Sequence, residues 1–92
     1  MTSLEFSIHA RERLRQRRVT RKQVAEAVQR PDILFKDAES SSLVAVRKTN
    51  HRYPVVIYVP REEANRVVTV YHASDVDRLI RRKLGRGVWT KE

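Results

Sequence analysis

The sequence contains no cysteine and very little glycine, with two glycines and three prolines among its 92 residues. Without cysteine the chain can form neither a disulfide nor a thiolate metal site, and it has no thiol nucleophile. Both glycines lie near the C-terminus, at Gly85 and Gly87, which excludes a glycine-rich phosphate-binding loop. No apolar run approaches the roughly 20 residues that span a bilayer, and no signal-peptide pattern follows Met1. These absences predict a cytoplasmic protein with no membrane partner.

Metal ligands are also scarce. The three histidines, His9, His51 and His72, match no known ligand spacing and have no nearby pair of carboxylates. Asp75 and Asp77 are better explained as acidic residues in the first turn of a helix, where the helix dipole favours them. We therefore expect no metal site and no cofactor.

Positive charge is what the sequence has in excess. Twenty Lys and Arg against eleven Asp and Glu give a net charge of +9 and a pI near 10.8. Fifteen of the basic residues are arginine, whose guanidinium group forms bidentate hydrogen bonds with phosphates and stacks on nucleobases. Such a chain attracts polyanions, so we expect a nucleic-acid partner, RNA in preference to DNA. An acidic protein partner is a second reading of the same charge, and an anionic membrane surface a third.

The pattern of apolar residues predicts one α+β domain over residues 1–92. Ser7 caps a helix from about Ile8 to Arg17. A capping box, Thr20-Arg21-Lys22-Gln23, opens a second helix that runs to about Gln29. Four strands follow at about residues 33–35, 43–48, 53–59 and 67–71, and short turns between them imply an antiparallel meander. A C-terminal helix over 74–84 and a tail over 85–92 complete the chain, and Trp89 can pin the tail to the body.

Three residues of the first helix carry the candidate chemistry. His9, Arg13 and Arg17 are spaced i, i+4, i+8 and form one stripe beside the packing face of that helix. Metal-independent RNA cleavage needs a proton acceptor, a proton donor and stabilisation of the charged phosphorane. Histidine performs either proton step near neutral pH, and arginine supplies the fixed positive charge.

The first helix also carries a family resemblance. The run Phe6 to Thr20 has a His-Ala pair, an Arg four residues after the His, another Arg four later, and then an apolar residue before a Ser or Thr. It resembles the opening motif of the domain-of-unknown-function family 4258, and the resemblance extends over about residues 6–72. Where that family commonly has glycine before the apolar residue, this chain has Arg18.

The resemblance implies a fold and an activity. The family is similar in outline to the RelE-like and BrnT-like toxin nucleases, which implies a RelE-like fold with the two N-terminal helices packed on a four-stranded antiparallel sheet. It further implies a toxin–antitoxin endoribonuclease acting on RNA, including ribosome-associated mRNA, and inhibited by an acidic antitoxin-like protein. When the motif of the family is matched to this sequence position by position, the resemblance implies that His9, Arg13 and Arg17 form the site.

Other residues complete the predicted site. Tyr71 joins the catalytic set because it can stack on a base or donate to a phosphate. Four more are expected to contact RNA: Arg11, Arg47, Arg52 and His72, with Arg47 reaching the same sheet face as Tyr71. His72 and His51 are also candidate general acids. The main alternative is a basic RNA- or DNA-binding module without catalysis, and a further one is a basic partner for an acidic protein.

Overall fold

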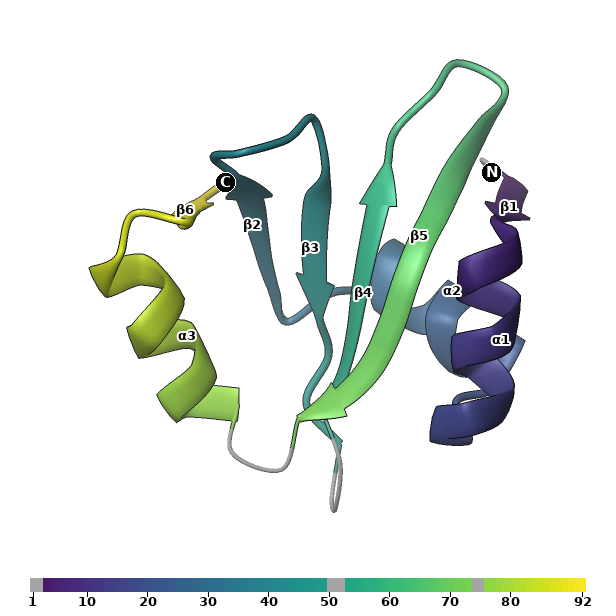
Figure 1. Cartoon of the computed structure of the whole chain (residues 1–92), viewed down its shortest axis with the longest axis horizontal. Helices are drawn as coiled ribbons and strands as arrows, with labels where there is room; N and C mark the ends of the chain where they lie inside the picture. The colour runs from purple at the N-terminus through teal and green to yellow at the C-terminus, as the bar shows by residue number, and fades with distance from the viewer. Residues whose placement is uncertain (1–2, 50–52, 74–75) are drawn as a thin grey trace.

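The strands of the protein form a single mixed sheet in the order β1-β5-β4-β3-β2-β6. The structure, a computed structural model, describes residues 3–49, 53–73 and 76–92. Figure 1 shows α2 behind the sheet, α1 beside β5, and α3 at the opposite side of the molecule. The elements in chain order are β1 (Ser3–Phe6), α1 (Ile8–Arg17), α2 (Arg21–Gln29), β2 (Ile33–Asp37), β3 (Leu43–Val46), β4 (Tyr53–Val59), β5 (Ala64–Ala73), α3 (Val76–Gly85) and β6 (Trp89–Lys91).

The predicted four-stranded antiparallel sheet is wrong, because the described residues form six strands and one pair of them is parallel. The four predicted strands form the antiparallel centre, β2 to β5. At one edge β1 pairs in parallel with β5, and at the other β6 pairs antiparallel with β2. Both added strands are too short, at four and three residues, to show a period of two in the sequence. The predicted RelE-like arrangement of two N-terminal helices on a four-stranded sheet is therefore corrected to three helices and a six-stranded mixed sheet.

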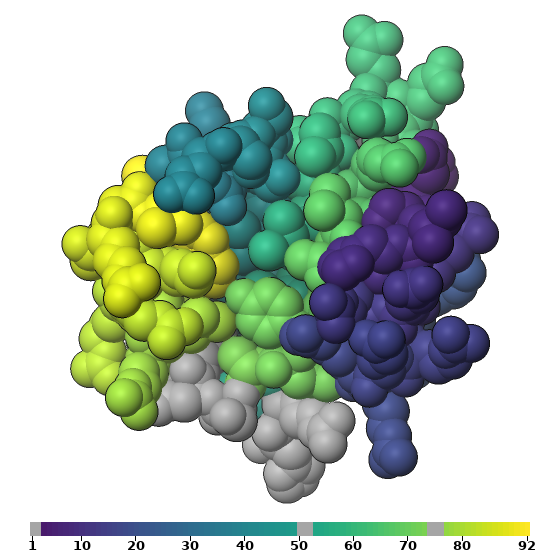
Figure 2. All heavy atoms as spheres, viewed as in Figure 1, coloured from purple at the N-terminus to yellow at the C-terminus, as the bar shows by residue number. Residues whose placement is uncertain are grey.

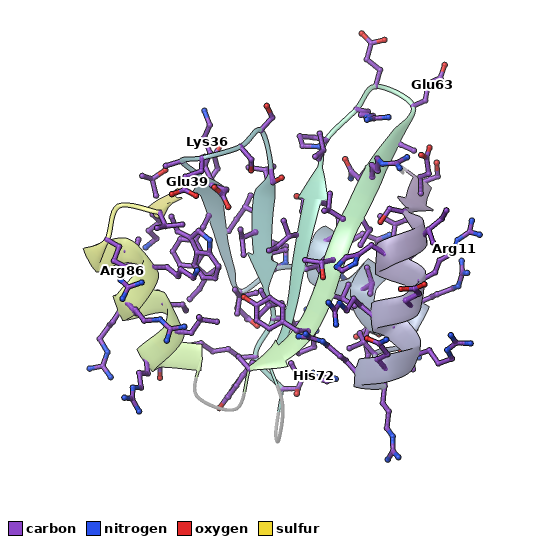
Figure 3. The ribbon with its side chains drawn as sticks, in the orientation of Figure 1. Arg11, Lys36, Glu39, Glu63, His72 and Arg86 are labelled. Carbon is purple, nitrogen blue, oxygen red and sulfur yellow. The ribbon has the colours of Figure 1, made fainter. Side chains whose placement is uncertain are left out.

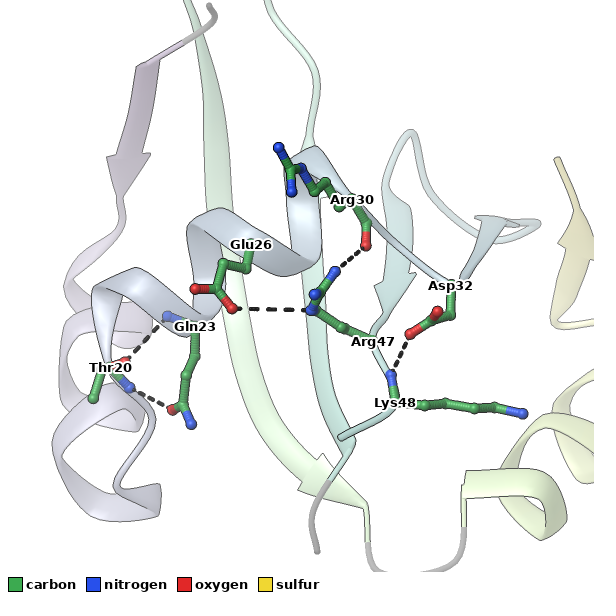
Figure 4. A network of polar contacts seen from close by, with 7 residues as sticks. All are labelled: Thr20, Gln23, Glu26, Arg30, Asp32, Arg47 and Lys48. Carbon is green, nitrogen blue, oxygen red and sulfur yellow. Dashed lines mark hydrogen bonds and ion pairs between the residues drawn. The ribbon is translucent and has the colours of Figure 1, made fainter. Parts of the chain in front are cut away.

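Local signals set the starts of both N-terminal helices. The Ser7 hydroxyl accepts a hydrogen bond from the Ala10 amide at 3.0 Å, which caps α1 as predicted. At α2 the Gln23 amide donates to the Thr20 hydroxyl at 3.1 Å, and the Thr20 amide donates back to the Gln23 side chain at 2.9 Å. Figure 4 shows this capping box. The predicted bounds of α1 and the predicted box are confirmed.

The break between the two helices depends on one strained residue. Arg18 has φ 54° and ψ 42°, the left-handed conformation, and its amide donates to the Leu14 carbonyl. Side chains with a Cβ rarely adopt this conformation, because the Cβ crowds the following carbonyl. The arginine thus keeps the left-handed C-terminal cap that glycine more commonly provides.

Each face of the sheet has its own hydrophobic core. On one face, α1 and α2 cover a cluster that includes Ala10, Val24 and Val56. On the other face, Ile80 of α3 and Trp89 of β6 pack on Phe35, and the two rings stack with centroids 5.2 Å apart. Trp89 therefore anchors the C-terminal segment to the sheet, whereas the sequence leaves open whether this tail is loose or pinned.

Candidate functional site

The stripe on α1 is continuous in the structure. The Arg13 Nε donates a hydrogen bond to His9 Nε2 at 3.2 Å, and Arg13 Nη1 donates to the Gln16 side chain at 3.1 Å. His9 and Arg17 are exposed and Arg13 is half-buried. The lone pair of His9 Nε2 that accepts this hydrogen bond is the one that a general base would use.

The stripe ends at a tyrosine on the sheet. The Arg17 guanidinium lies over the Tyr71 ring, 5.7 Å from its centroid, within the range of a cation–π contact. Tyr71 belongs to the cluster on the face of the sheet that α3 packs against, together with Leu79 of that helix. α1 approaches this tyrosine because β1 pairs only with Ala64 to Val67, the first half of β5. The structure therefore pairs the four predicted catalytic residues two by two, His9 with Arg13 and Arg17 with Tyr71, and α1 aligns the two pairs.

Two effects act in opposite directions on the pKa of the Tyr71 phenol. Burial raises its pKa above the ordinary tyrosine value, and the positive charges of Arg17 and Arg82 act in the opposite direction. Arg82 is on α3, 65 positions along the chain from Arg17, so the two helices bring cations to one phenol. In Figure 2 atoms of β5 lie between those of α1 and those of α3 on the face in view.

Arg82 is the site residue that the sequence reasoning missed. It follows Leu79 by three positions, so it lies on the same side of α3 one turn further along. The apolar stripe of this helix was evident in the sequence. Its orientation toward Tyr71 was not, because that depends on where the helix packs on the sheet.

Arg47 lies on the other face of the sheet from Tyr71. Its guanidinium donates to the Arg30 carbonyl at 2.7 Å and is 3.9 Å from the Glu26 carboxylate, so it fastens the end of α2 to the sheet (Figure 4). Side chains alternate between faces along a strand, and Arg47 follows Val46, which belongs to the cluster under α3. Arg47 is thus a structural contact of α2.

The remaining predicted RNA contacts do not gather at Tyr71. His72 is the next residue on β5 and so points to the opposite face, where Pro54 is its partner across the strands (Figure 3). Arg11 projects outward from α1, away from the sheet (Figure 3). Arg52 and His51 lie outside the described residues.

The described residues offer neither a metal site nor a membrane-spanning helix. Among residues 3–49, 53–73 and 76–92, no group of three or more His, Asp or Glu side chains is placed to hold a metal ion. No helix in the described part of the chain is long and apolar enough to cross a membrane. On the α3 side of the sheet the Arg17 guanidinium meets the Tyr71 ring, and the His9 imidazole with the Arg13 guanidinium precedes them along α1. Such groups can bind an anion and move a proton.

Comparison with known proteins identifies the family. No curated protein and no solved structure gives a significant match to the chain. A family model described as a domain of unknown function, DUF4258, matches residues 6–72, which include α1, α2 and strands β2 to β4 in full and most of β5. The predicted resemblance to this family is thereby confirmed, and the chain belongs to the DUF4258 family.

Proposed function

We propose that this protein is a metal-independent endoribonuclease of the RelE and BrnT toxin kind, with its site along the path from His9 to Tyr71. The observation that carries the proposal is the alignment of two contacting pairs along α1. A potential base, two cations and an aromatic ring follow one another on α1 and β5, with Arg13 bonded to His9 and Arg17 over Tyr71. The net charge of +9 supports a polyanionic substrate.

The chemistry follows from the order of these groups. His9 Nε2 takes the proton from a ribose 2′-hydroxyl, whose oxygen attacks the adjacent phosphorus while the bond to the 5′-oxygen breaks. For this step Nε2 exchanges the Arg13 N–H for the hydroxyl, which frees Arg13 to turn toward the phosphate. Arg13 and Arg17 stabilise the charge on the phosphorane, and the 5′-oxygen leaves by taking a proton from a solvent water. The Tyr71 ring stacks on a nucleobase of the RNA, or its hydroxyl donates a hydrogen bond to a phosphate oxygen. The products are a 2′,3′-cyclic phosphate and a 5′-hydroxyl.

The test is cleavage of a mixed-sequence RNA in EDTA, with the product ends identified. We expect His9→Ala to lower the rate by about a hundredfold to ten-thousandfold, the usual range for loss of an acid or base, with folding unchanged. Arg17→Ala should lower both rate and affinity. The matched control is Arg61→Ala, which removes an equal charge from the exposed turn before β5. Full activity of His9→Ala would refute this assignment of the base.

A non-catalytic RNA-binding module is the second candidate, and the surroundings of His9 favour it. Catalytic histidines are commonly oriented by a carboxylate, yet the hydrogen bond of His9 in the described structure is to Arg13. This candidate predicts RNA affinity that falls steeply with salt and no cleavage on free RNA or translating ribosomes. A toxin would in addition slow growth when expressed without an acidic partner, which a simple binding module would not.

A further inference from the structure

The opposite edge of α1 carries a second basic surface. Successive residues of a helix are rotated by about 100°, so Arg11 and Arg15 lie on the far side of α1 from Arg13. Arg11 and Arg15 are exposed, and Figure 3 shows Arg11 directed away from the sheet. These arginines therefore cannot serve the same bound group as the stripe that leads to Tyr71.

Two adjoining hollows follow this edge. One has a volume of about 340 Å³ and lies between α1 and the start of α2, and the other has about 250 Å³ and lies along the first turns of α1. They share Arg11 and Arg15 and so form one surface, which we call the outer groove. Its lining residues are Ile8, Arg11, Glu12, Leu14, Arg15, Val19 and Arg21.

The outer groove combines aliphatic side chains with arginines that have no acidic partner in the described structure. Ile8, which is 78% exposed, lies at one end of the outer groove, and Leu14 and Val19 lie at the other end. The ion pairs of the described residues involve Arg47, Lys48 and Arg66. Arg21 is held in place by its contact with the Phe6 ring, 4.9 Å from the guanidinium carbon to the centroid.

We propose that the outer groove binds an acidic amphipathic segment of another protein, with its apolar side chains on Ile8 and Leu14 and its carboxylates on Arg11, Arg15 and Arg21. Charge complementarity selects an acidic occupant, and the aliphatic lining gives it apolar surface to cover. Arginine is enriched at protein–protein interfaces, and Arg11 and Arg15 are the residues that both hollows share.

Protein fits this groove better than RNA because the groove offers nothing on which bases can stack. The lining contains no aromatic ring, and single-stranded RNA is held chiefly by stacking its bases on aromatic side chains. This inference does not depend on RNA cleavage, because the groove and the stripe lie on opposite edges of α1.

The experiment uses the intact protein and a fluorescent synthetic peptide of about four helical turns. The peptide carries leucine along one face and glutamate elsewhere, and the comparison peptide has the same composition in scrambled order. We expect the patterned peptide to bind at least about tenfold more tightly than the scrambled one. Ile8→Ser and Arg15→Glu should each weaken its binding by about tenfold. The matched control is Arg17→Glu, an identical charge reversal on the opposite edge, which should leave its binding within about threefold.

Several outcomes would overturn the proposal. Equal affinity for both peptides would show that net charge alone attracts them. An equal loss from Arg17→Glu and Arg15→Glu would place the peptide elsewhere or spread it over the surface. If an oligouridylate displaced the patterned peptide and shifted the amide NMR signals of Ile8 and Arg15, the groove would be an RNA surface. Shifts confined to the outer groove on adding the peptide would support the proposal, and thermal unfolding of each variant would confirm that it is folded.

Discussion

Arg18 offers the sharpest test of the structure, because its strain comes from the backbone. Replacing it with glycine removes the Cβ that opposes φ 54° and keeps the amide that donates to the Leu14 carbonyl. The Arg18 side chain is exposed, so its removal costs little packing. We expect Arg18→Gly to stabilise the protein.

The magnitude follows from two opposing terms. A residue with a Cβ costs roughly 1–2 kcal/mol in the left-handed conformation. Glycine gives back about 0.4–1 kcal/mol of this gain, because it makes the unfolded chain more flexible. The midpoints of these two ranges differ by about 0.8 kcal/mol, so we expect the free energy of unfolding to rise by about 0.5–1 kcal/mol. For a domain of this size, that raises the melting temperature by about 2–8 °C.

The assay is thermal and urea unfolding of three proteins: the original chain, Arg18→Gly and Arg18→Ala. Alanine removes the same charge near the end of α1 and the same side chain, but it retains the Cβ. The comparison of glycine with alanine therefore isolates the backbone term from the interaction of arginine with the helix dipole. Equal stability of the two variants would refute the left-handed assignment at this position.

Three other predictions concern stability. Trp89→Ala should lower the free energy of unfolding by about 3–5 kcal/mol, measured by urea unfolding, because it removes the ring stacked on Phe35; a loss below about 1 kcal/mol would show that β6 is not docked. Arg47→Ala should cost about 1 kcal/mol by losing the hydrogen bond to the Arg30 carbonyl, whereas Glu26→Gln, which removes only a long and exposed ion pair, should cost far less. Burial raises the pKa of both Tyr58 and Tyr71, so the unfolded chain loses these protons first as the pH rises, and stability should fall above pH about 10. In melting temperatures measured from about pH 8 to 12, Tyr71→Phe should make that fall shallower. An unchanged slope would contradict the burial of the Tyr71 phenol.

The sequence predicts the elements whose signals are local. The Ser7 cap, the Thr20–Gln23 box and the bounds of α1 depend on contacts within a few residues, and they are confirmed. The pairings of β1 and β6 depend on partners far along the chain. Ser3 lies opposite Ala64, and no local pattern encodes that register. The conformation of Arg18 was also hidden, because the residue type argues against it and the cap geometry decides it.

The same distinction explains the candidate site. The stripe from His9 to Arg17 follows from helical spacing, and the structure adds the hydrogen bond within it. Alternation along a strand separates Tyr71 from His72, but which face of the sheet α1 approaches is a tertiary outcome. Arg47 was therefore expected beside Tyr71, and it lies instead under α2.

The division of α1 into two edges gives the family match and the rest of the chain separate roles. The match ends at His72, so α1 and most of β5 belong to the family region and α3 does not. Tyr71 nevertheless packs with Leu79 and is influenced by Arg82, both on α3. A chain with the same family region and a different C-terminal helix would thus keep the stripe and the outer groove but lose one cation at Tyr71. If the proposed cleavage and the proposed binding of an acidic segment hold, differences in substrate among such chains should follow α3, and differences in protein partner should follow the outer edge of α1.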